Sequence, residues 1–143
     1  MRNFYTSLAL LAAMAFMVPA HAASDFAEKK VVLQISDNDP SKQTLVLNVA
    51  NNLIKHYGQN KVAIEIVAFG PGLRLLFENN SNSSRIDNLT TNEVAFSACG
   101  NTIDSMTELL GHAPELHKDA KRVPGGVVRI MDLVDQGYQL IKP

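Results

Sequence analysis

Residues 93–102, EVAFSACGNT, join a short apolar run to a glycine and then to the beginning of a helical pattern. The run at 93–98 has the length and composition of a buried strand. Beyond Gly100, apolar residues recur at helical spacing at Ile103, Met106 and Leu109, which predicts an amphipathic helix. A buried strand that passes directly into a helix is the repeating unit of an α/β protein.

The same alternation extends in both directions along the chain. Pro40 suits the first turn of a helix, and Gly58 and Gly137 suit helix ends. Alternating strands and helices imply right-handed βαβ units, so we predict an α/β fold, a three-layer α/β/α domain with a mainly parallel central sheet. The strands are expected at 31–35, 61–69, 93–98, 121–123 and 138–141, and the helices at 41–57, 73–77, 85–91, 103–110 and 127–134.

The first 22 residues have the pattern of a cleavable signal peptide. Arg2 supplies a positive charge, an apolar run follows at 8–18, and Ala20-His21-Ala22 offers small residues to a signal peptidase. The alternative is an uncleaved membrane anchor, but the run is shorter than the roughly 20 residues that span a bilayer. We therefore expect residues 1–22 to be a signal peptide and 23–143 to be one domain, periplasmic or secreted.

The composition of that domain argues against two classes of partner, nucleic acid and membranes. The chain has 13 basic and 14 acidic side chains, a net charge of −1. No basic stripe is present to neutralise phosphates, which argues against nucleic acid. No second apolar segment is long enough to span a bilayer, so no stable membrane insertion is expected after cleavage.

Cys99 is the single cysteine, so it forms no internal disulfide. Such a thiol is buried and inert, paired between chains, or reactive. At the end of a strand and the start of a helix, backbone N–H groups would lower the pKa of the Cys99 thiol. Gly100 would let the backbone approach and leave the sulfur accessible, and Asn101 or Thr102 could cap the helix or bind a ligand.

The competing interpretation makes Cys99 a small core residue, since free cysteines are among the most buried residues. Phe96 and Met106 could then enclose the sulfur and raise its pKa. Both interpretations stay open from the residues alone.

Two other loops share the expected place of Cys99 at the carboxyl ends of the strands, where α/β proteins bind ligands: 36–40 and 70–72. Gly70 and Gly72 could present backbone N–H groups to an anion, or simply form a turn. His112 and His117 lack a recognised ligand spacing, so we expect surface histidines and no metal. No hydrolase triad, nucleophile elbow or dinucleotide-binding motif occurs in the sequence.

Four segments together resemble the DsrE/DsrF-like family: the loop at 36–40, VAFGPG at 67–72, FSACGNT at 96–102 and GYQLIKP at 137–143. The resemblance covers nearly all of residues 23–143. It implies a compact α/β fold, assembly as homotrimers or hexamers, and a persulfide carried on a cysteine near the end of a central strand. Cys99 matches that cysteine. Its setting differs from that of the cytoplasmic sulfur-relay members and resembles that of a poorly characterised branch, and the expected signal peptide makes this branch an exported one.

Three functions follow as hypotheses. The first is a thiol-based sulfur carrier or redox accessory protein that needs no cofactor, exchanges sulfur through Cys99 with a donor or acceptor protein, and performs no other catalysis. The second is an oligomeric binding module with a cleft near the Gly70 and Cys99 loops. The third is a structural assembly unit. The expected binding residues are Gly70, Gly72, Gly100, Asn101 and Thr102. For the first hypothesis, Cys99 should be accessible and more acidic than a free thiol.

Overall fold

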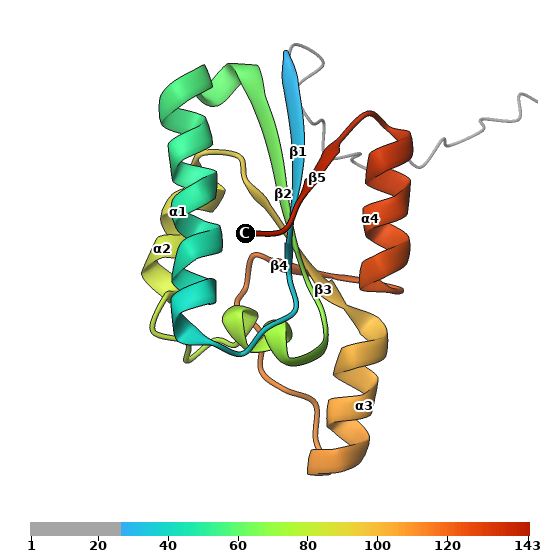
Figure 1. Cartoon of the computed structure of the whole chain (residues 1–143). Coiled ribbons are helices and arrows are strands. Elements are labelled where there is room, and N and C mark those ends of the chain that lie inside the picture. The colour runs from blue at the N-terminus through green and yellow to red at the C-terminus, as the bar shows by residue number, and fades with distance from the viewer. Residues whose placement is uncertain (1–26) are drawn as a thin grey trace, which may run out of the picture.

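A computed structural model describes residues 27–143 of the chain. Within them, five strands form one sheet in the order β4-β3-β2-β1-β5, and every pair of neighbours is parallel (Figure 1). The fold-class prediction is confirmed. The strands are β1 (Lys29–Ile35), β2 (Val62–Ala68), β3 (Ala95–Cys99), β4 (Ala120–Val123) and β5 (Gln139–Ile141).

Helices cover both faces of the sheet, which gives three layers (Figure 1). On one side lie α1 (Pro40–Tyr57) and α2 (Ser83–Thr91), and on the other lies α4 (Gly126–Asp135). Between β2 and α2 the chain forms a 3-10 helix, Gly70–Leu76. Helix α3 (Gly100–Leu110) begins where β3 ends and extends beyond the edge of the sheet.

Helix α1 shows why the sequence pattern located the elements well. An Asp39 carboxylate oxygen accepts a hydrogen bond from the Ser41 N–H at 2.8 Å and caps the helix, while Pro40 occupies its first turn. Gly58 ends it with φ of +92°. Val46, Leu47 and Ala50 face the sheet and are fully buried. Burial of this apolar stripe fixes the helix in the position that its periodicity predicts.

The two faces of the sheet bury different kinds of side chain. All seven residues of β2, VAIEIVA, are buried. Because side chains alternate across a strand, Ile64 and Ile66 join the large apolar core under α1 and α2. Ala63 and Val67 join a smaller cluster under α4, and Glu65 lies between them on that face. A charged side chain thus lies within the layer between the sheet and α4.

Three details differ from the expected arrangement or lie beyond it. Helix α2 begins at Ser83 instead of residue 85, and the residue before it, Asn82, is buried. The cause is Asn80, whose side-chain oxygen accepts the Asn82 N–H at 2.9 Å and tightens the turn. The predicted signal peptide, 1–22, lies outside the described residues. Within the described part of the chain, no helix is long and apolar enough to cross a membrane.

Candidate functional site

The loops at the carboxyl ends of β1, β2 and β3 meet at one edge of the sheet, as the sequence predicts. The Phe69 N–H donates to the Ile35 carbonyl at 3.2 Å. A Cβ on Gly72 would overlap that same carbonyl oxygen, so only glycine fits there. The Gly70 N–H donates to the Thr102 hydroxyl at 2.9 Å and joins this loop to α3. The edge is therefore a tightly packed junction.

Cys99 lies inside this junction and is only 5% exposed. The expectation that its sulfur is solvent-accessible is wrong for the chain as it stands. A Cβ on Gly100 would lie 2.8 Å from the Val123 carbonyl oxygen and 3.0 Å from that of Pro124. Because Gly100 has no side chain, the chain that follows β4 can pack closely against it. The glycine therefore does not open the sulfur to solvent.

The surroundings of Cys99 favour its thiolate. Burial raises the pKa of the thiol, but hydrogen bonds from the Thr102 hydroxyl and from the backbone N–H groups of Gly126, Thr102 and Asn101 outweigh it. The pKa therefore lies below its ordinary value, as predicted. Cys99 is the N-cap residue of α3, and the Asn101 and Thr102 N–H groups at the start of that helix act on its sulfur without reaching the geometry of a standard cap hydrogen bond. No acidic residue occurs in the first turn of α3 or α4, so both helix N-termini favour a negative charge here.

Thr102 connects two of the predicted loops through one hydroxyl group. Its oxygen accepts the Gly70 N–H, which leaves the hydroxyl proton for the Cys99 sulfur. The Gly70 loop therefore acts on the thiol indirectly, by orienting its donor.

The predicted binding residues divide between surface and interior. Gly70, Asn101 and Thr102 line an open depression of about 450 Å³, whose wall also includes Arg74 and Met106. Gly72 and Gly100 are buried and do not line it, and neither does Cys99. The depression and the thiol are thus neighbouring features that share Thr102 and Asn101.

An ion pair near the thiol, between a buried glutamate and a half-buried arginine, is not among the features predicted from the sequence. Arg129 of α4 makes two hydrogen bonds to the Glu65 carboxylate, from Nε to Oε1 at 2.7 Å and from Nη2 to Oε2 at 2.6 Å. The Ser97 hydroxyl donates to Oε1 at 2.5 Å. One signal was present in the sequence. A glutamate within the apolar run of β2 is unlikely to be buried without a partner, because a lone buried charge is costly.

A second cavity, of about 300 Å³, adjoins this ion pair. Its polar lining includes Glu65, Ser97, Arg129 and Tyr138, and its apolar lining includes Phe96 and Leu133. Burial raises the pKa of Tyr138, and the nearby Glu65 carboxylate raises it further. This cavity lies on the face of the sheet that is covered by α4.

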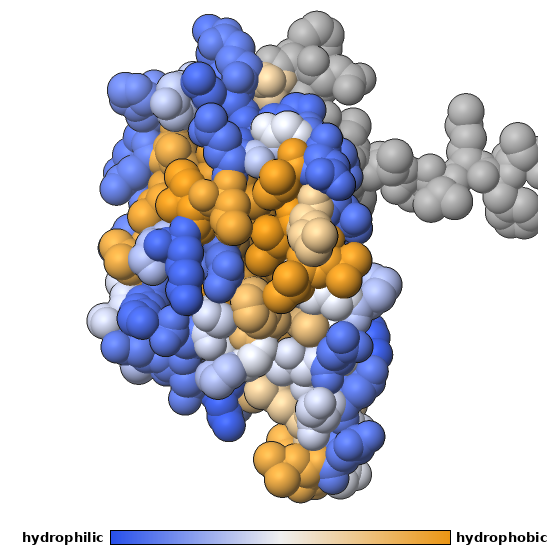
Figure 2. Space-filling view, turned by 45° about the vertical axis from the view of Figure 1, so that its right-hand side comes forward, coloured by the Kyte–Doolittle hydropathy of each residue, from blue (hydrophilic) through white to orange (hydrophobic). Residues whose placement is uncertain are grey.

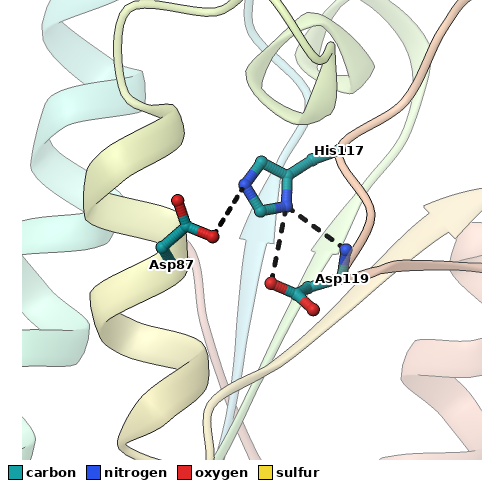
Figure 3. A group of neighbouring side chains, drawn as sticks. All are labelled: Asp87, His117 and Asp119. Carbon is teal, nitrogen blue, oxygen red and sulfur yellow. Dashed lines mark hydrogen bonds and ion pairs between the residues drawn. The ribbon is translucent and has the colours of Figure 1, made fainter.

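Asp87, His117 and Asp119 form the cluster in Figure 3, in which the imidazole lies between two carboxylates. His117 Nε2 lies 3.6 Å from Asp87 Oδ1, and Nδ1 lies 3.7 Å from Asp119 Oδ2. The Lys118 ammonium is 2.6 Å from both of these carboxylate oxygens and neutralises the charge that a metal ion would need. We therefore assign the cluster to the packing of this segment against α2.

The expectation of two surface histidines holds for His112, which is exposed, but is wrong for His117, which is 6% exposed. The reason is a backbone contact: the His117 N–H donates to the Leu76 carbonyl at 2.8 Å and draws the residue inward.

The fold and this site define a class of protein: a small parallel α/β domain with one cysteine at the carboxyl edge of its sheet. Two solved structures share the fold. The protein of unknown function MTH1491 from Methanobacterium thermoautotrophicum is 28% identical with a TM-score of 0.73, and the match covers 80% of this chain and 99% of that one. The ychN protein from E. coli is 13% identical with a TM-score of 0.62, over 80% and 99% of the two chains.

The sequence comparisons add no family assignment. No protein-family model matches the sequence, and no curated protein matches it. The α/β fold with a parallel sheet is the fold that the DsrE/DsrF-like resemblance implies.

Proposed function

We propose that this chain is an exported DsrE/DsrF-like protein in which Cys99 carries sulfur as a persulfide. The observation that supports the proposal most is the set of donors around one sulfur. A threonine hydroxyl and the N-termini of two helices lower the pKa of Cys99 although the residue is buried. The thiolate is the nucleophile in sulfur exchange, so this setting favours the reactive form.

The transfer step is a thiol exchange without net oxidation. The Cys99 thiolate attacks the outer sulfur of a donor persulfide, R–S–SH. A bond forms between Sγ and that sulfur, the S–S bond of the donor breaks, and the products are Cys99–S–SH and the donor thiolate R–S⁻. Because Cys99 is only 5% exposed, the attack requires the junction around the sulfur to open.

Export is part of the proposal. Its support is the apolar run at 8–18 followed by Ala20-His21-Ala22, with cleavage after Ala22. The donor or acceptor of sulfur would then be met in the periplasm or outside the cell.

Self-association is the third part, with assembly through the surface formed by α4 and β5. Figure 2 shows a continuous apolar area on this side of the molecule. On α4, Val127, Val128 and Met131 are more than half exposed, and on β5 Leu140 is 48% exposed. Monomeric proteins rarely expose such a patch, and the family resemblance implies a trimer or hexamer of identical chains. Light scattering on the wild type and on Met131→Asp tests self-association through this surface. We expect an oligomer in the wild type and a smaller species in the variant, and monomers in both would contradict the proposal.

Intact mass spectrometry of freshly isolated protein, with and without reductant, tests the sulfur chemistry. We expect a fraction of the chains to begin at Ala23 and to carry one additional sulfur atom, which reductant removes and which Cys99→Ser lacks. Incubation with a small-molecule persulfide should increase that fraction. A mature chain that acquires no sulfur, and whose thiol reacts with iodoacetamide only after denaturation, would contradict sulfur carriage.

A binding module is the second candidate, and one observation favours it. The open depression of about 450 Å³ lies beside Cys99 and presents Gly70, Asn101 and Thr102 to solvent while the sulfur stays covered. If Cys99 proves inert, this depression becomes the site, and ligand binding should survive Cys99→Ser.

A further inference from the structure

We propose that Glu65 and Arg129 are positioning residues for Cys99: their ion pair holds the first turn of α4 on the sheet, so that the Gly126 N–H stays at the sulfur. The inference rests on the proposed role of Cys99 as a thiolate and adds two residues that do not touch the sulfur.

The first step concerns the beginning of α4. Gly125 is its N-cap residue and has no side chain with which to cap it. The Arg129 N–H donates to the Gly125 carbonyl at 2.9 Å and closes the first turn, with Gly126 inside that turn. A contact that holds Arg129 in place therefore also holds Gly126, because both lie in one hydrogen-bonded turn. This turn packs against the start of α3, since a Cβ on Gly125 would lie 3.6 Å from Asn101 Nδ2.

The second step concerns what fixes Arg129. Its guanidinium forms two parallel hydrogen bonds with Glu65, a geometry that sets orientation as well as distance. Glu65 is itself 4% exposed in the centre of the sheet, and the Ser97 hydroxyl holds its Oε1. Ser97 and Cys99 lie two residues apart on β3 and point to the same face. Strand β3 therefore carries both the sulfur of Cys99 and the hydroxyl group that holds Glu65 of the ion pair.

The third step is that α4 does not need the pair simply to dock. Ile130 and Leu133 bury its apolar side against Val32 and Val67. A buried ion pair is also a poor source of net stability, because desolvation offsets its attraction. The apolar contacts of Ile130 and Leu133 lie beyond the first turn of α4 and do not fix its position. We assign that effect to the ion pair.

A direct effect of the two charges on the Cys99 thiolate would give a different result from positioning, and the experiment distinguishes the two. The elements packed around Cys99 carry charged groups that include Glu65 on β2, Arg129 on α4, Lys121 and Arg122 on β4, and Asp104 on α3. None of them donates to the sulfur. If the pair acted only through charge, Glu65→Gln would favour the thiolate, and Arg129→Lys, which keeps the charge, would change nothing. If it positions Gly126, both variants disfavour the thiolate.

The experiment follows the ultraviolet absorbance of the Cys99 thiolate against pH in the full chain, with the Cys99→Ser form of each variant subtracted. We expect Glu65→Gln and Arg129→Lys each to have a roughly threefold smaller thiolate fraction at pH 7 than wild type, which is half a unit in the titration midpoint. Ser97→Ala, the mildest change, should give a smaller shift in the same direction. Leu47→Ala, which weakens the opposite face, should leave the midpoint in place.

Two results would overturn the inference. One is unchanged midpoints in all three variants despite a loss of stability, which would make the pair purely structural. The other is a lowered thiolate midpoint in Glu65→Gln together with an unchanged midpoint in Arg129→Lys, which would mean that the ion pair acts on Cys99 through charge alone. The titration needs no bound sulfur, so it is independent of failed persulfide loading.

Discussion

The sheet face under α1 and α2 is covered by the larger apolar core, whereas the face under α4 carries an ion pair, a cysteine and a cavity of about 300 Å³. The first face buries Leu33, Ile66 and Phe96 completely. The second has a smaller cluster around Val67 and Leu133, and beside it lie Glu65, Arg129 and Cys99.

The same strands supply both faces. In β3, Phe96 and Ala98 enter the large core, and Ser97 and Cys99 point the other way. Stability and chemistry are therefore separated by one residue along the chain. The comparison teaches that a substitution on the apolar face should change stability and leave the Cys99 thiolate as it is, whereas a substitution on the polar face can change both. Four measurements can break or sharpen this difference.

The largest effect is expected on the polar face. Arg129→Met leaves the Glu65 carboxylate buried with only the Ser97 hydroxyl as a partner, and should lower the free energy of unfolding by about 4 kcal/mol. The double variant Glu65→Leu/Arg129→Met removes both charges and should recover most of that loss. Urea denaturation at one fixed protein concentration measures both. Equal losses in the single and double variants would mean that the pair contributes net stability.

On the apolar face, Leu47→Ala should cost about 3 kcal/mol, because it leaves a cavity in the core beneath α1. The same urea titration measures the loss. The thiolate midpoint of Cys99 in the folded protein should stay that of wild type. A shifted midpoint would show that the two faces are coupled through the sheet.

Thr102→Val is a smaller change at the junction. It removes the acceptor of the Gly70 N–H and the hydroxyl donor to Cys99, and should cost about 1 kcal/mol. It should also raise the thiolate midpoint, whereas Thr102→Ser keeps the hydroxyl and should behave as wild type. If serine shifted the midpoint as far as valine, the hydroxyl would not be the relevant group.

The smallest effect is a pH dependence. The folded pKa of Cys99 is lowered, so the wild type should gain stability relative to Cys99→Ser as pH rises through the folded value toward that of an unfolded thiol, about 8.5. The gain should level off above it and vanish below the folded pKa.

Tyr138 acts in the opposite sense at higher pH. Because its folded pKa is raised, the free energy of unfolding falls as pH increases beyond the ordinary tyrosine range. This loss is the same in wild type and in Cys99→Ser, so it cancels in the comparison. Unfolding free energies of the two proteins across this range measure the difference. A difference independent of pH would contradict the lowered pKa.

The order of the elements and the place of Cys99 could be predicted because both depend on local patterns. Apolar periodicity located α1, and a strand followed by glycine located the carboxyl edge. The cover over Cys99 could not be predicted, since it depends on where the chain returns after β4. The partner of Glu65 lies 64 residues away, and its distance in sequence left only a lone charge within an apolar run as a signal. Burial of His117 likewise results from a backbone contact with Leu76.

Three of the four donors at the Cys99 sulfur are main-chain amides, and this has a consequence for mutational scanning. Side-chain replacement leaves an amide in place unless the new residue is proline, so the contribution of these three amides to the acidity of the thiol is invisible to an alanine scan. A Cβ on Gly126 would lie 2.9 Å from that of Phe69, so substitution there would register as misfolding. Any sequence that keeps the backbone of this junction would keep these three amides around a cysteine at this one position.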